Sequence, residues 1–539
     1  DSLNGVRAAR NDIVVVLWIM GSALLIIALG SGFLFSNRVA KPLKKLEAAM
    51  DSATCYDEWR EAAIEHDDES GAARWREVNQ SRRYDYASIQ TRLEHLRKLR
   101  ENDDDRGLLF ALNEGIHGNM GGMGKSELYG KAKIGTKKLI EDYVEEVALA
   151  LEHLASPEVD TISFEEKLDF FQRASHCFGR SALMLSGSGT LLYFHLGVAR
   201  ALWQERLLPD IISGSSGGAF IGSVVCASTD EELDELFAVG LTHGQEQPTG
   251  LLSRIFRFVA SRRMTSNDIW EGLEEFLPDL TFEESFKRTG RHMNVSVAPA
   301  ENHQKSRLLN SDTSPNVFMR EAVMASAAIP GFFPSVVLMA KNDQGERQAY
   351  LSSRKWVDGS LSEDLPAKRL ARLYGVNHYI VSQTNPYVIP FIDTTKRKTD
   401  AVSEIKYAVI DTARAWINAG AAIFEKPLSV VPDVQRVTNS ALSLINQSYV
   451  GDITISPLSK LHNPLRALSW RTQEEITELV DEGERATWPR IERIRIQTRI
   501  SRTLDPILRD YEDQHIEHYG KPVRATKSKG ARPRRRKAG

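Results

Sequence analysis

The chain has 539 residues, of which 42% are hydrophobic and 26% charged, and its formal net charge is −3. This balance is typical of a globular protein with more than one domain, and it argues against a disordered chain. The nearly balanced charge gives no reason to expect a nucleic acid as partner. The three cysteines, Cys55, Cys177 and Cys226, form no CxxC pair, which argues against a disulfide framework or a zinc site and favours a reducing compartment.

The first predicted unit, residues 1–50, contains a candidate membrane anchor. Residues 13–37 carry no charge, and a helix of that length covers the ~30 Å hydrocarbon core of a bilayer. A buried core helix is the alternative. The basic segment 37–50 is expected to form a juxtamembrane helix. Its excess of Lys and Arg over the segment before the span predicts a single-pass protein whose larger, C-terminal part is cytoplasmic.

Four further units are expected from the periodicity of the sequence. Residues 51–178 show apolar residues at helical spacing and are predicted to form a helical domain. In residues 179–386, short apolar runs alternate with helical segments, which predicts an α/β sheet with strands near 181–186, 210–213, 292–298 and 378–383. A C-terminal helical extension, 387–520, has amphipathic segments at 401–424 and 472–501, and a basic, disordered tail, 521–539, follows.

The motif GxSxG occurs at Gly214, Ser216 and Gly218. A predicted strand precedes it and a helix follows it, which is the context of a nucleophile elbow. Such a turn exposes a hydroxyl at the carboxyl end of a sheet, and the following helix N-terminus favours the developing negative charge. The pattern therefore predicts a serine nucleophile at Ser216.

Two other segments contribute to this interpretation. The loop Gly187-Ser188-Gly189 joins a predicted strand to the helix 191–204, and its backbone N–H groups could hold an oxyanion or a phosphate, or the loop could be a plain turn. The pair Asp358-Gly359 on its own is most often a turn, and it gains weight from the other two motifs.

In this order, the three motifs closely resemble the patatin-like phospholipase family. The segments 185–198, 325–333 and 356–361 resemble the branch that contains the yeast and plant lipid-droplet triacylglycerol lipases. The segments 56–59, 128–129 and 135–141 resemble the helical domain that precedes the patatin domain in that branch.

This resemblance implies a patatin-like three-layer α/β sandwich and a Ser–Asp dyad that hydrolyses acyl esters without a metal or another cofactor. Residue by residue, it implies Ser216 as nucleophile, Asp358 as proton acceptor, and Gly187, Ser188 and Gly189 as the oxyanion hole. The implied substrates are triacylglycerol or glycerophospholipid at a membrane or lipid-droplet surface.

Two alternatives compete with this interpretation. A Ser-His-Asp hydrolase would need a histidine after Asp358, but His378 lies at the start of its predicted strand, at the wrong end for a triad. His195 lies within a helix and is expected to be a core or supporting residue. A catalytically weak membrane scaffold is the other alternative, and the presence of Ser216 and Asp358 argues against it.

The chain departs from the family at one position. The family's loop usually reads GxGxxG, and here Leu192 stands at the position of the last Gly. We expect Leu192 to occupy part of the acyl groove and to bias the chain length of the substrate. Ser188 is expected to be tolerated unless its φ angle must be positive.

Overall fold

A computed structural model describes residues 41–116, 118–238, 265–301, 306–330, 332–359, 364–385, 451–457 and 471–519. The predicted membrane segment 13–37, the predicted helix 401–424 and the tail 521–539 lie outside these residues. Among the helices that are described, none has both the length and the apolar character needed to cross a bilayer. The transmembrane helix therefore stays a prediction.

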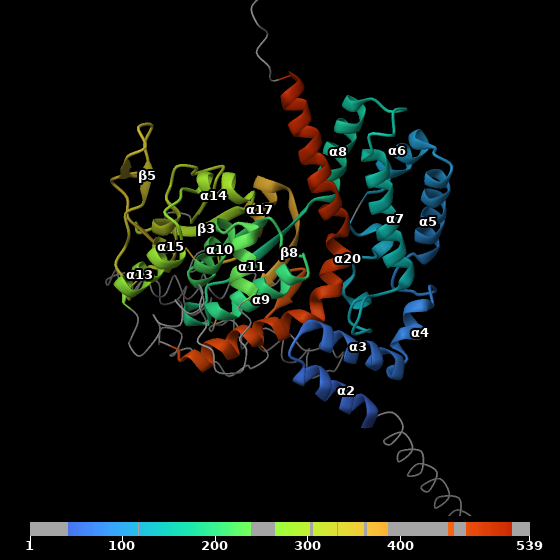
Figure 1. The fold of residues 1–539 in the computed structure, drawn as a ribbon, viewed down its shortest axis with the longest axis horizontal. Helices are drawn as coiled ribbons and strands as arrows, with labels where there is room; N and C mark the ends of the chain where they lie inside the picture. The colour runs from blue at the N-terminus through green and yellow to red at the C-terminus, as the bar shows by residue number, and fades with distance from the viewer. Residues whose placement is uncertain are drawn as a thin grey trace, which may run out of the picture.

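The centre of the α/β part is a largely parallel sheet (Figure 1). Its parallel strands are β1 (Arg180–Leu185), β2 (Ile211–Gly214), β3 (His292–Pro299), β8 (Val376–Ser382) and β9 (Ile453–Ile455). The four predicted strands are confirmed, whereas β9 was not predicted. The strand order β4-β3-β2-β1-β8-β9 reverses direction at β1, so the loop after β1 lies at a topological switch point, where open α/β sheets bind ligands.

Antiparallel strands complete the sheet and extend it. The short strand β4 (Arg307–Leu309) forms one edge, and β7 (Trp356–Asp358) pairs with the end of β3. A separate hairpin consists of β5 (Met339–Lys341) and β6 (Arg347–Ala349).

Both faces of the sheet are covered by helices, because successive side chains of a strand point to opposite faces. On β1, Leu183 and Leu185 belong to the main hydrophobic core, whereas Ala182 and Met184 belong to a smaller one on the other face. The main core is closed by α9 (Leu192–Gln204), α10 (Gly217–Ala227), α15 (Met319–Ala327) and the first part of α20. Helix α17 (Ala367–Tyr374) packs on the smaller core, so the α/β part has three layers.

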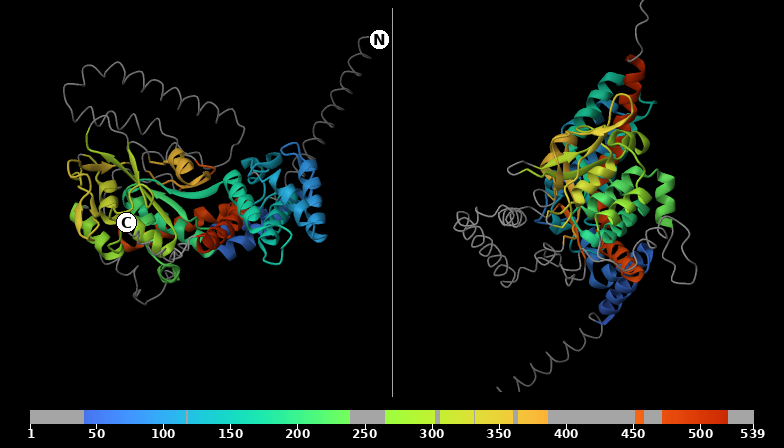
Figure 2. Two further views of the ribbon diagram at one scale, coloured as in Figure 1. Left: turned by 90° about the horizontal axis from the view of Figure 1, so that it is seen from above. Right: turned by 90° about the vertical axis from the view of Figure 1, so that its left-hand side faces the viewer.

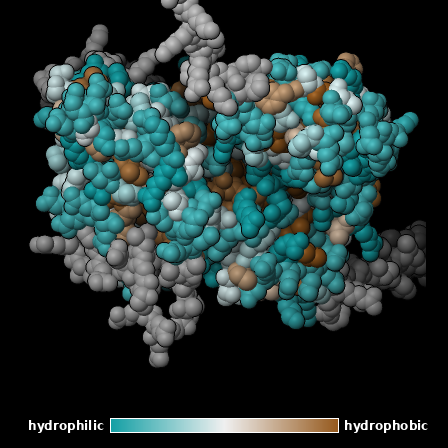
Figure 3. Space-filling view, turned by 45° about the horizontal axis from the view of Figure 1, so that its top comes forward, coloured by the Kyte–Doolittle hydropathy of each residue, from teal (hydrophilic) through white to brown (hydrophobic). Residues whose placement is uncertain are grey.

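The helical part has a hydrophobic core of its own. Ile89, Leu93 and Leu96 are buried there as their spacing predicts, while Leu99 is only partly buried. The α/β part and the helical part lie at opposite ends of the molecule (Figure 2), and hydrophobic residues show in a hollow between them (Figure 3). The helices between residues 41 and 178 are α2 (Lys41–Ser52), α3 (Tyr56–Ser70), α4 (Ala72–Glu77), α5 (Tyr86–Glu101), α6 (Asp105–Asn113), α7 (Lys138–Ala155) and α8 (Phe164–Phe178). The buried hydrophobic residues of α2 and α3 belong to the main core of the α/β part.

Helix α20 (Gln473–Tyr519) connects the two parts. It continues well beyond residue 501, where the amphipathic pattern predicted its end. Its first half contributes Ile491 and Ile494 to the main core of the α/β part, and its second half contributes Leu504 and Tyr511 to the core of the helical part. Two prolines, Pro489 and Pro506, lie inside it, and a proline removes a backbone hydrogen bond and bends a helix. Figure 1 shows the change of direction.

Glycines let α20 approach α9 at backbone distance. A Cβ atom on Gly197 would lie 2.0 Å from the carbonyl oxygen of Val480, and one on Gly483 would lie 2.3 Å from that of Phe194. The remaining described elements are α11 (Asp230–Ala238), α13 (Ser266–Phe276), α14 (Phe282–Thr289) and the 3₁₀ turns η2 (Met120–Gly122), η3 (Ser126–Leu128) and η4 (Gly189–Leu191).

Candidate active site

Ser216 occupies a sharp turn between β2 and α10. Its φ of 50° and ψ of −119° lie in a region that residues with a side chain rarely adopt. Close packing explains why positions 214 and 218 of the motif are glycines. A Cβ on Gly214 would lie 2.4 Å from the carbonyl oxygen of Gly218, and one on Gly218 would lie 2.4 Å from that of Leu185. The predicted sharp turn between strand and helix is thus present, with Ser216 after the carboxyl end of β2.

A buried serine that the sequence analysis did not single out holds the elbow. The backbone N–H of Ser216 donates to Oγ of Ser326 over 2.9 Å, and this hydroxyl donates to the carbonyl oxygen of Ser296 over 2.8 Å. Ser326 lies on α15 and Ser296 on β3. The strained turn is therefore tied to the neighbouring strand through a single hydroxyl.

Asp358 reaches the same strand from the other direction. Strand β4 pairs with one edge of β3, at both Val295 and Val297. On the other edge, Val295 pairs with Gly214 of β2, and Val297 pairs with Asp358 of β7. Strands β2 and β7 therefore share one edge of β3 and run toward each other along it. Asp358 stands two residues beyond the register position of Gly214, so the fold brings Asp358 and Ser216 to one edge of β3.

Burial and close packing restrict this junction further. Ser216 and Asp358 are 7% and 3% exposed. A Cβ on Gly359 would lie 2.5 Å from the carbonyl carbon of Ser296, so only glycine fits after Asp358 at this approach to β3. The Asp358-Gly359 pair was ambiguous as a sequence feature, and the packing of Gly359 against β3 now explains why a glycine follows Asp358.

The Gly187–Gly189 loop packs against Gly217, the residue that follows Ser216. A Cβ on Gly217 would lie 2.2 Å from Oγ of Ser188, 2.8 Å from the carbonyl oxygen of Gly189 and 3.0 Å from Cβ of Leu192. Ser188 has a φ of −137°, which a side chain tolerates, whereas Gly189 has a φ of 54°. Leu192 is partly buried beside the elbow.

The backbone amide of Gly187, which was expected to hold an oxyanion, has another role in the structure. Its N–H donates to Oδ1 of Asp364 over 2.7 Å, so this donor is already used. Within the described part of the chain, the N–H groups of Ser188 and Gly189 have no hydrogen-bond acceptor. Of the three amides expected to hold an oxyanion, Gly187 therefore fixes the loop in place, and the other two remain candidates.

Asp364 links the loop after β1 to the elbow after β2, and the sequence analysis missed it. Besides its bond to Gly187, its backbone carbonyl accepts from Oγ of Ser215 over 3.1 Å, and its Oδ2 accepts from the amide of Asn385 over 3.4 Å. The residue is 1% exposed. Burial raises the pKa of Asp364 to about 6, although the hydrogen bond from the Gly187 amide favours the charged form.

Comparison with known proteins decides the family. Residues 183–371 match the patatin-like phospholipase family, and residues 36–176 match a domain of unknown function, DUF3336. Triacylglycerol lipase ptl2 of Schizosaccharomyces pombe is 31% identical over 479 residues, which cover 86% of this chain and 75% of that protein. The chain belongs to the patatin-like phospholipase family.

The relatives of this patatin-like chain also include two proteins of Saccharomyces cerevisiae. Triacylglycerol lipase 4 is 34% identical over 473 residues, covering 83% of this chain and 51% of that protein. Triacylglycerol lipase 5 is 31% identical over 480 residues, covering 84% and 63%. The chain spans about half the length of the first curated relatives it matches. The combination of the two domains with yeast triacylglycerol lipases as relatives confirms the branch that the sequence motifs indicated.

His195 has a supporting position in this patatin-like fold. It is fully buried, its Nδ1 lies 2.7 Å from Oγ of Ser382, and its Nε2 lies 3.0 Å from the carbonyl oxygen of Ser186. Burial lowers the pKa of His195 to about 4, so the ring is neutral at pH 7. Because a carbonyl oxygen only accepts, the proton is on Nε2. His195 thus fixes the end of β1 and takes no part in the Ser216 turn, as expected.

His378 lies at the amino end of the parallel strand β8. Its Nδ1 is 3.1 Å from Oγ of Ser181, its register partner on β1, and its Nε2 is 3.1 Å from Oε1 of Gln497. Ser216 lies at the carboxyl end of the same sheet. The predicted position of His378 near the amino end of its strand is confirmed. Among the described residues, no group of three or more His, Cys, Asp or Glu side chains is placed to hold a metal ion.

Proposed function

We propose that this chain is a serine lipid acyl hydrolase that cleaves acyl esters of triacylglycerol or glycerophospholipid through Ser216 and Asp358. The observation that carries the proposal is the meeting of the two residues at one edge of β3, with Ser216 in the backbone conformation of a nucleophile elbow. The names of its relatives, triacylglycerol lipases of two yeasts, support the class of substrate.

In the proposed first half-reaction, Asp358 accepts the proton of the Ser216 hydroxyl while Oγ attacks the ester carbonyl. The N–H groups of Ser188 and Gly189 hold the oxyanion, and the N-terminus of α10 adds a favourable dipole. The C–O bond of the ester then breaks, and Asp358 returns the proton to the departing alcohol. The products of this step are the free alcohol and an acyl ester on Ser216.

In the second half-reaction, Asp358 accepts a proton from water, whose oxygen attacks the acyl-enzyme. The fatty acid leaves, and Ser216 regains its proton. A fully hydrated carboxylate is a weak base, and the burial of Asp358 removes most of the competing water. The neighbouring bond between the Ser216 amide and Ser326 keeps Oγ oriented through both steps.

The test is labelling by a fluorophosphonate probe together with fatty-acid release from emulsified triolein. Ser216→Ala should lose both, and Asp358→Asn should lose nearly all of both. Ser223→Ala is a matched control, because Ser223 is a buried serine of α10 whose hydroxyl has no hydrogen-bond partner among the described residues. Fatty-acid release by Ser216→Ala at the wild-type rate would refute the proposal.

Other outcomes assign the chemistry differently. Normal labelling of Asp358→Asn, combined with lost labelling of a His378→Ala variant, would establish a triad in place of the dyad. A wild-type chain that neither reacts with the probe nor releases fatty acid would favour the membrane scaffold.

We also infer that the chain is anchored at a membrane or lipid-droplet surface by one span, with the catalytic part in the cytoplasm. The uncharged segment 13–37 supports the anchor, and the exposed Lys41, Lys44 and Lys45 on α2 suit contact with anionic headgroups. A chain without residues 1–37 should become extractable by salt, whereas the full chain should resist both salt and carbonate. A truncated chain that resists both treatments would place the anchor elsewhere.

A further inference from the structure

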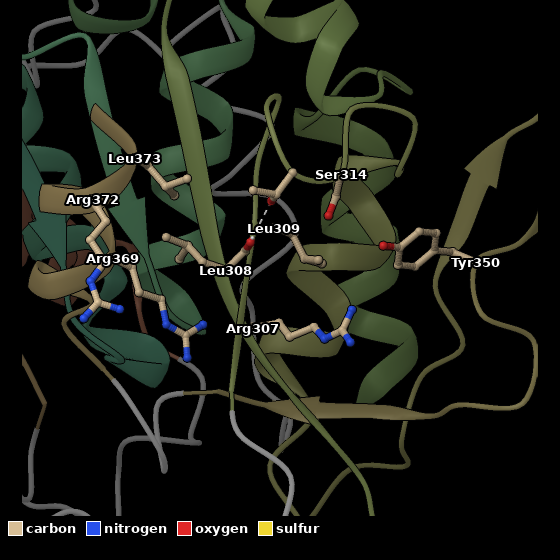
Figure 4. A pocket seen from close by; sticks show the side chains of 9 residues that line it. Arg307, Leu308, Leu309, Ser314, Tyr350, Arg369, Arg372 and Leu373 are labelled. Carbon is tan, nitrogen blue, oxygen red and sulfur yellow. Dashed lines mark hydrogen bonds between the residues drawn. The ribbon is translucent and has the colours of Figure 1, made fainter. Parts of the chain in front are cut away.

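A basic pocket lies beside the edge strand β4, outside the site already described (Figure 4). Its cavity volume is about 330 Å³. Arg307 comes from β4, Arg369 and Arg372 come from α17, and Tyr350 closes the far side. Three arginines from two elements that are distant in sequence thus line one cavity.

Two of the three arginines carry positive charge that no described carboxylate balances. None of its described lining residues is Asp or Glu, and none of the described carboxylates forms an ion pair with Arg307 or Arg372. Both of these side chains are exposed, and each attracts an anion at close range.

Two of the arginines are held in position by the fold. Nη2 of Arg369 donates to the carbonyl oxygen of Ser306 over 2.6 Å and to its Oγ over 3.0 Å. The guanidinium carbon of Arg307 lies 5.7 Å from the ring centroid of Trp356, within range of a cation–π contact. These contacts reduce the entropy that an arginine loses when it binds an anion.

The pocket and the candidate active site share one end of the sheet. Val297 of β3 pairs with Arg307 on one edge and with Asp358 on the other. At two strand spacings, the backbones of Arg307 and Asp358 are about 10 Å apart. A lipid surface that offers an acyl ester to Ser216 would therefore also face this pocket.

We propose that the pocket binds the phosphate monoester headgroup of an anionic phospholipid in the surface from which the substrate is taken. A phosphate monoester has up to two negative charges and three terminal oxygens, and guanidinium groups bind such oxygens in pairs. A carboxylate offers one charge and two oxygens, which a single arginine satisfies. The apolar Leu308 and the 40% exposed Leu373 lie beside the arginines, where the glycerol and first acyl carbons of a lipid would follow its headgroup.

The experiment measures binding of dioctanoyl phosphatidate to the full chain in a neutral detergent, by calorimetric titration. The Ser216→Ala variant is used, so the result does not depend on the proposed hydrolysis. Arg307→Gln and Arg372→Gln should each weaken binding about tenfold, as expected for the loss of one charge-assisted contact to phosphate. Arg372→Lys, which keeps the charge but not the fork of donors, should lie between wild type and Arg372→Gln.

A charge-matched control separates a site from general surface charge. Arg60 and Arg82 are exposed arginines of the helical part that form no ion pair within the described residues. Arg60→Gln with Arg82→Gln should leave the affinity unchanged, and thermal unfolding checks that every variant is folded. Equal losses in the control double variant and in Arg307→Gln with Arg372→Gln would overturn the proposal.

Further ligands test the chemistry and its source. Dioctanoyl phosphatidylglycerol, a diester, and octanoate should bind more weakly than phosphatidate, and equal affinity of either would overturn the monoester assignment. Glycerol 3-phosphate should bind weakly because it lacks acyl chains. Equal affinity of glycerol 3-phosphate would assign the pocket to soluble phosphate esters and would overturn the lipid source.

Discussion

The carboxylate of Asp364 accepts a hydrogen bond from the backbone N–H of Gly187 over 2.7 Å. The same residue accepts a bond from Ser215 through its backbone carbonyl, so it joins the loop after β1 to the turn that carries Ser216. Asp364 is 1% exposed, and a buried carboxylate is tolerated only where hydrogen bonds compensate for lost water. The position of the Gly187–Gly189 loop relative to Ser216 therefore depends on this residue.

Loss of the Asp364 side chain should slow the reaction. Asp364→Ala leaves a buried N–H without an acceptor, which destabilises the fold by about 1–3 kcal/mol. Because the Gly187–Gly189 loop is then free to shift, kcat with p-nitrophenyl esters should fall much more than KM changes. Glu146→Ala is the control, since it removes a buried carboxylate of the helical part that pairs with Arg100. A control that loses as much kcat as Asp364→Ala would show that reduced stability explains both effects.

The free energy of unfolding should depend on pH because Asp364 titrates. The ordinary pKa of an aspartate carboxyl is 3.8, and burial raises the pKa of Asp364 to about 6 in the folded chain. Between these values the folded chain keeps a proton that the unfolded chain has lost, so the free energy of unfolding falls as pH rises and levels off above about pH 6. Each pH unit in this window corresponds to at most ~1.4 kcal/mol.

The measurement is urea unfolding of the detergent-solubilised chain at about pH 5 and about pH 7, where the slope of stability with pH reports the difference in bound protons. Asp364→Asn cannot titrate, so the decrease from the lower to the higher pH should be smaller in the variant than in the wild type. Equal decreases in the two chains would contradict the raised pKa of Asp364.

Ser326→Ala should weaken the elbow. The substitution removes both the acceptor for the Ser216 N–H and the donor to the Ser296 carbonyl. Two buried groups lose their partner, at a cost of about 1–3 kcal/mol each, and the rate of fluorophosphonate labelling should drop. Ser213→Ala is matched in chemistry and burial, but the Ser213 hydroxyl has no hydrogen-bond partner among the described residues, so this variant should label normally. Normal labelling of Ser326→Ala would mean that the turn holds its shape without that hydroxyl.

Gly217→Ala should separate the oxyanion loop from the nucleophile. The added Cβ would lie 2.2 Å from Oγ of Ser188 and 2.8 Å from the carbonyl oxygen of Gly189, so the loop must move away. We expect kcat to fall by a factor of about 10²–10³, the range seen when one oxyanion donor is lost. Gly130→Ala is the control, because a Cβ there meets only one atom, at 4.0 Å. Full activity of Gly217→Ala would place the oxyanion donors elsewhere.

Leu192→Gly should change the preference for acyl chain length. Leu192 is partly buried, and its Cβ lies 3.0 Å from where a Cβ of Gly217 would stand, so it borders the elbow. If it fills part of the acyl groove, its removal should shift the optimum in a series of p-nitrophenyl esters toward longer or bulkier chains. A uniform gain for all chain lengths would instead indicate that Leu192 distorts the oxyanion loop.

Local patterns in the sequence were sufficient for four strands of the sheet, for many of the helices and for the sharp turn at Ser216. The alternation of apolar residues on β1 and the helical spacing on α5 follow from the geometry of a strand and a helix, which involve only near neighbours. Ser216 was predicted for the same reason, because Gly214 and Gly218 make room for a tight turn within five residues. The end of α20 was misplaced, since its later turns are stabilised by packing against the helical part, which a local pattern does not contain.

The tertiary structure alone decided what surrounds Ser216. Ser216 and its partner Ser326 are 110 residues apart in the chain, and Gly187 and Asp364 are 177 apart. Neither the periodicity of the sequence nor the spacing of its residues indicates that a serine on a helix or an aspartate in a loop forms such a bond. The same holds for Gly187, whose N–H was expected to hold an oxyanion: whether a backbone donor is available depends on which acceptor the fold places beside it.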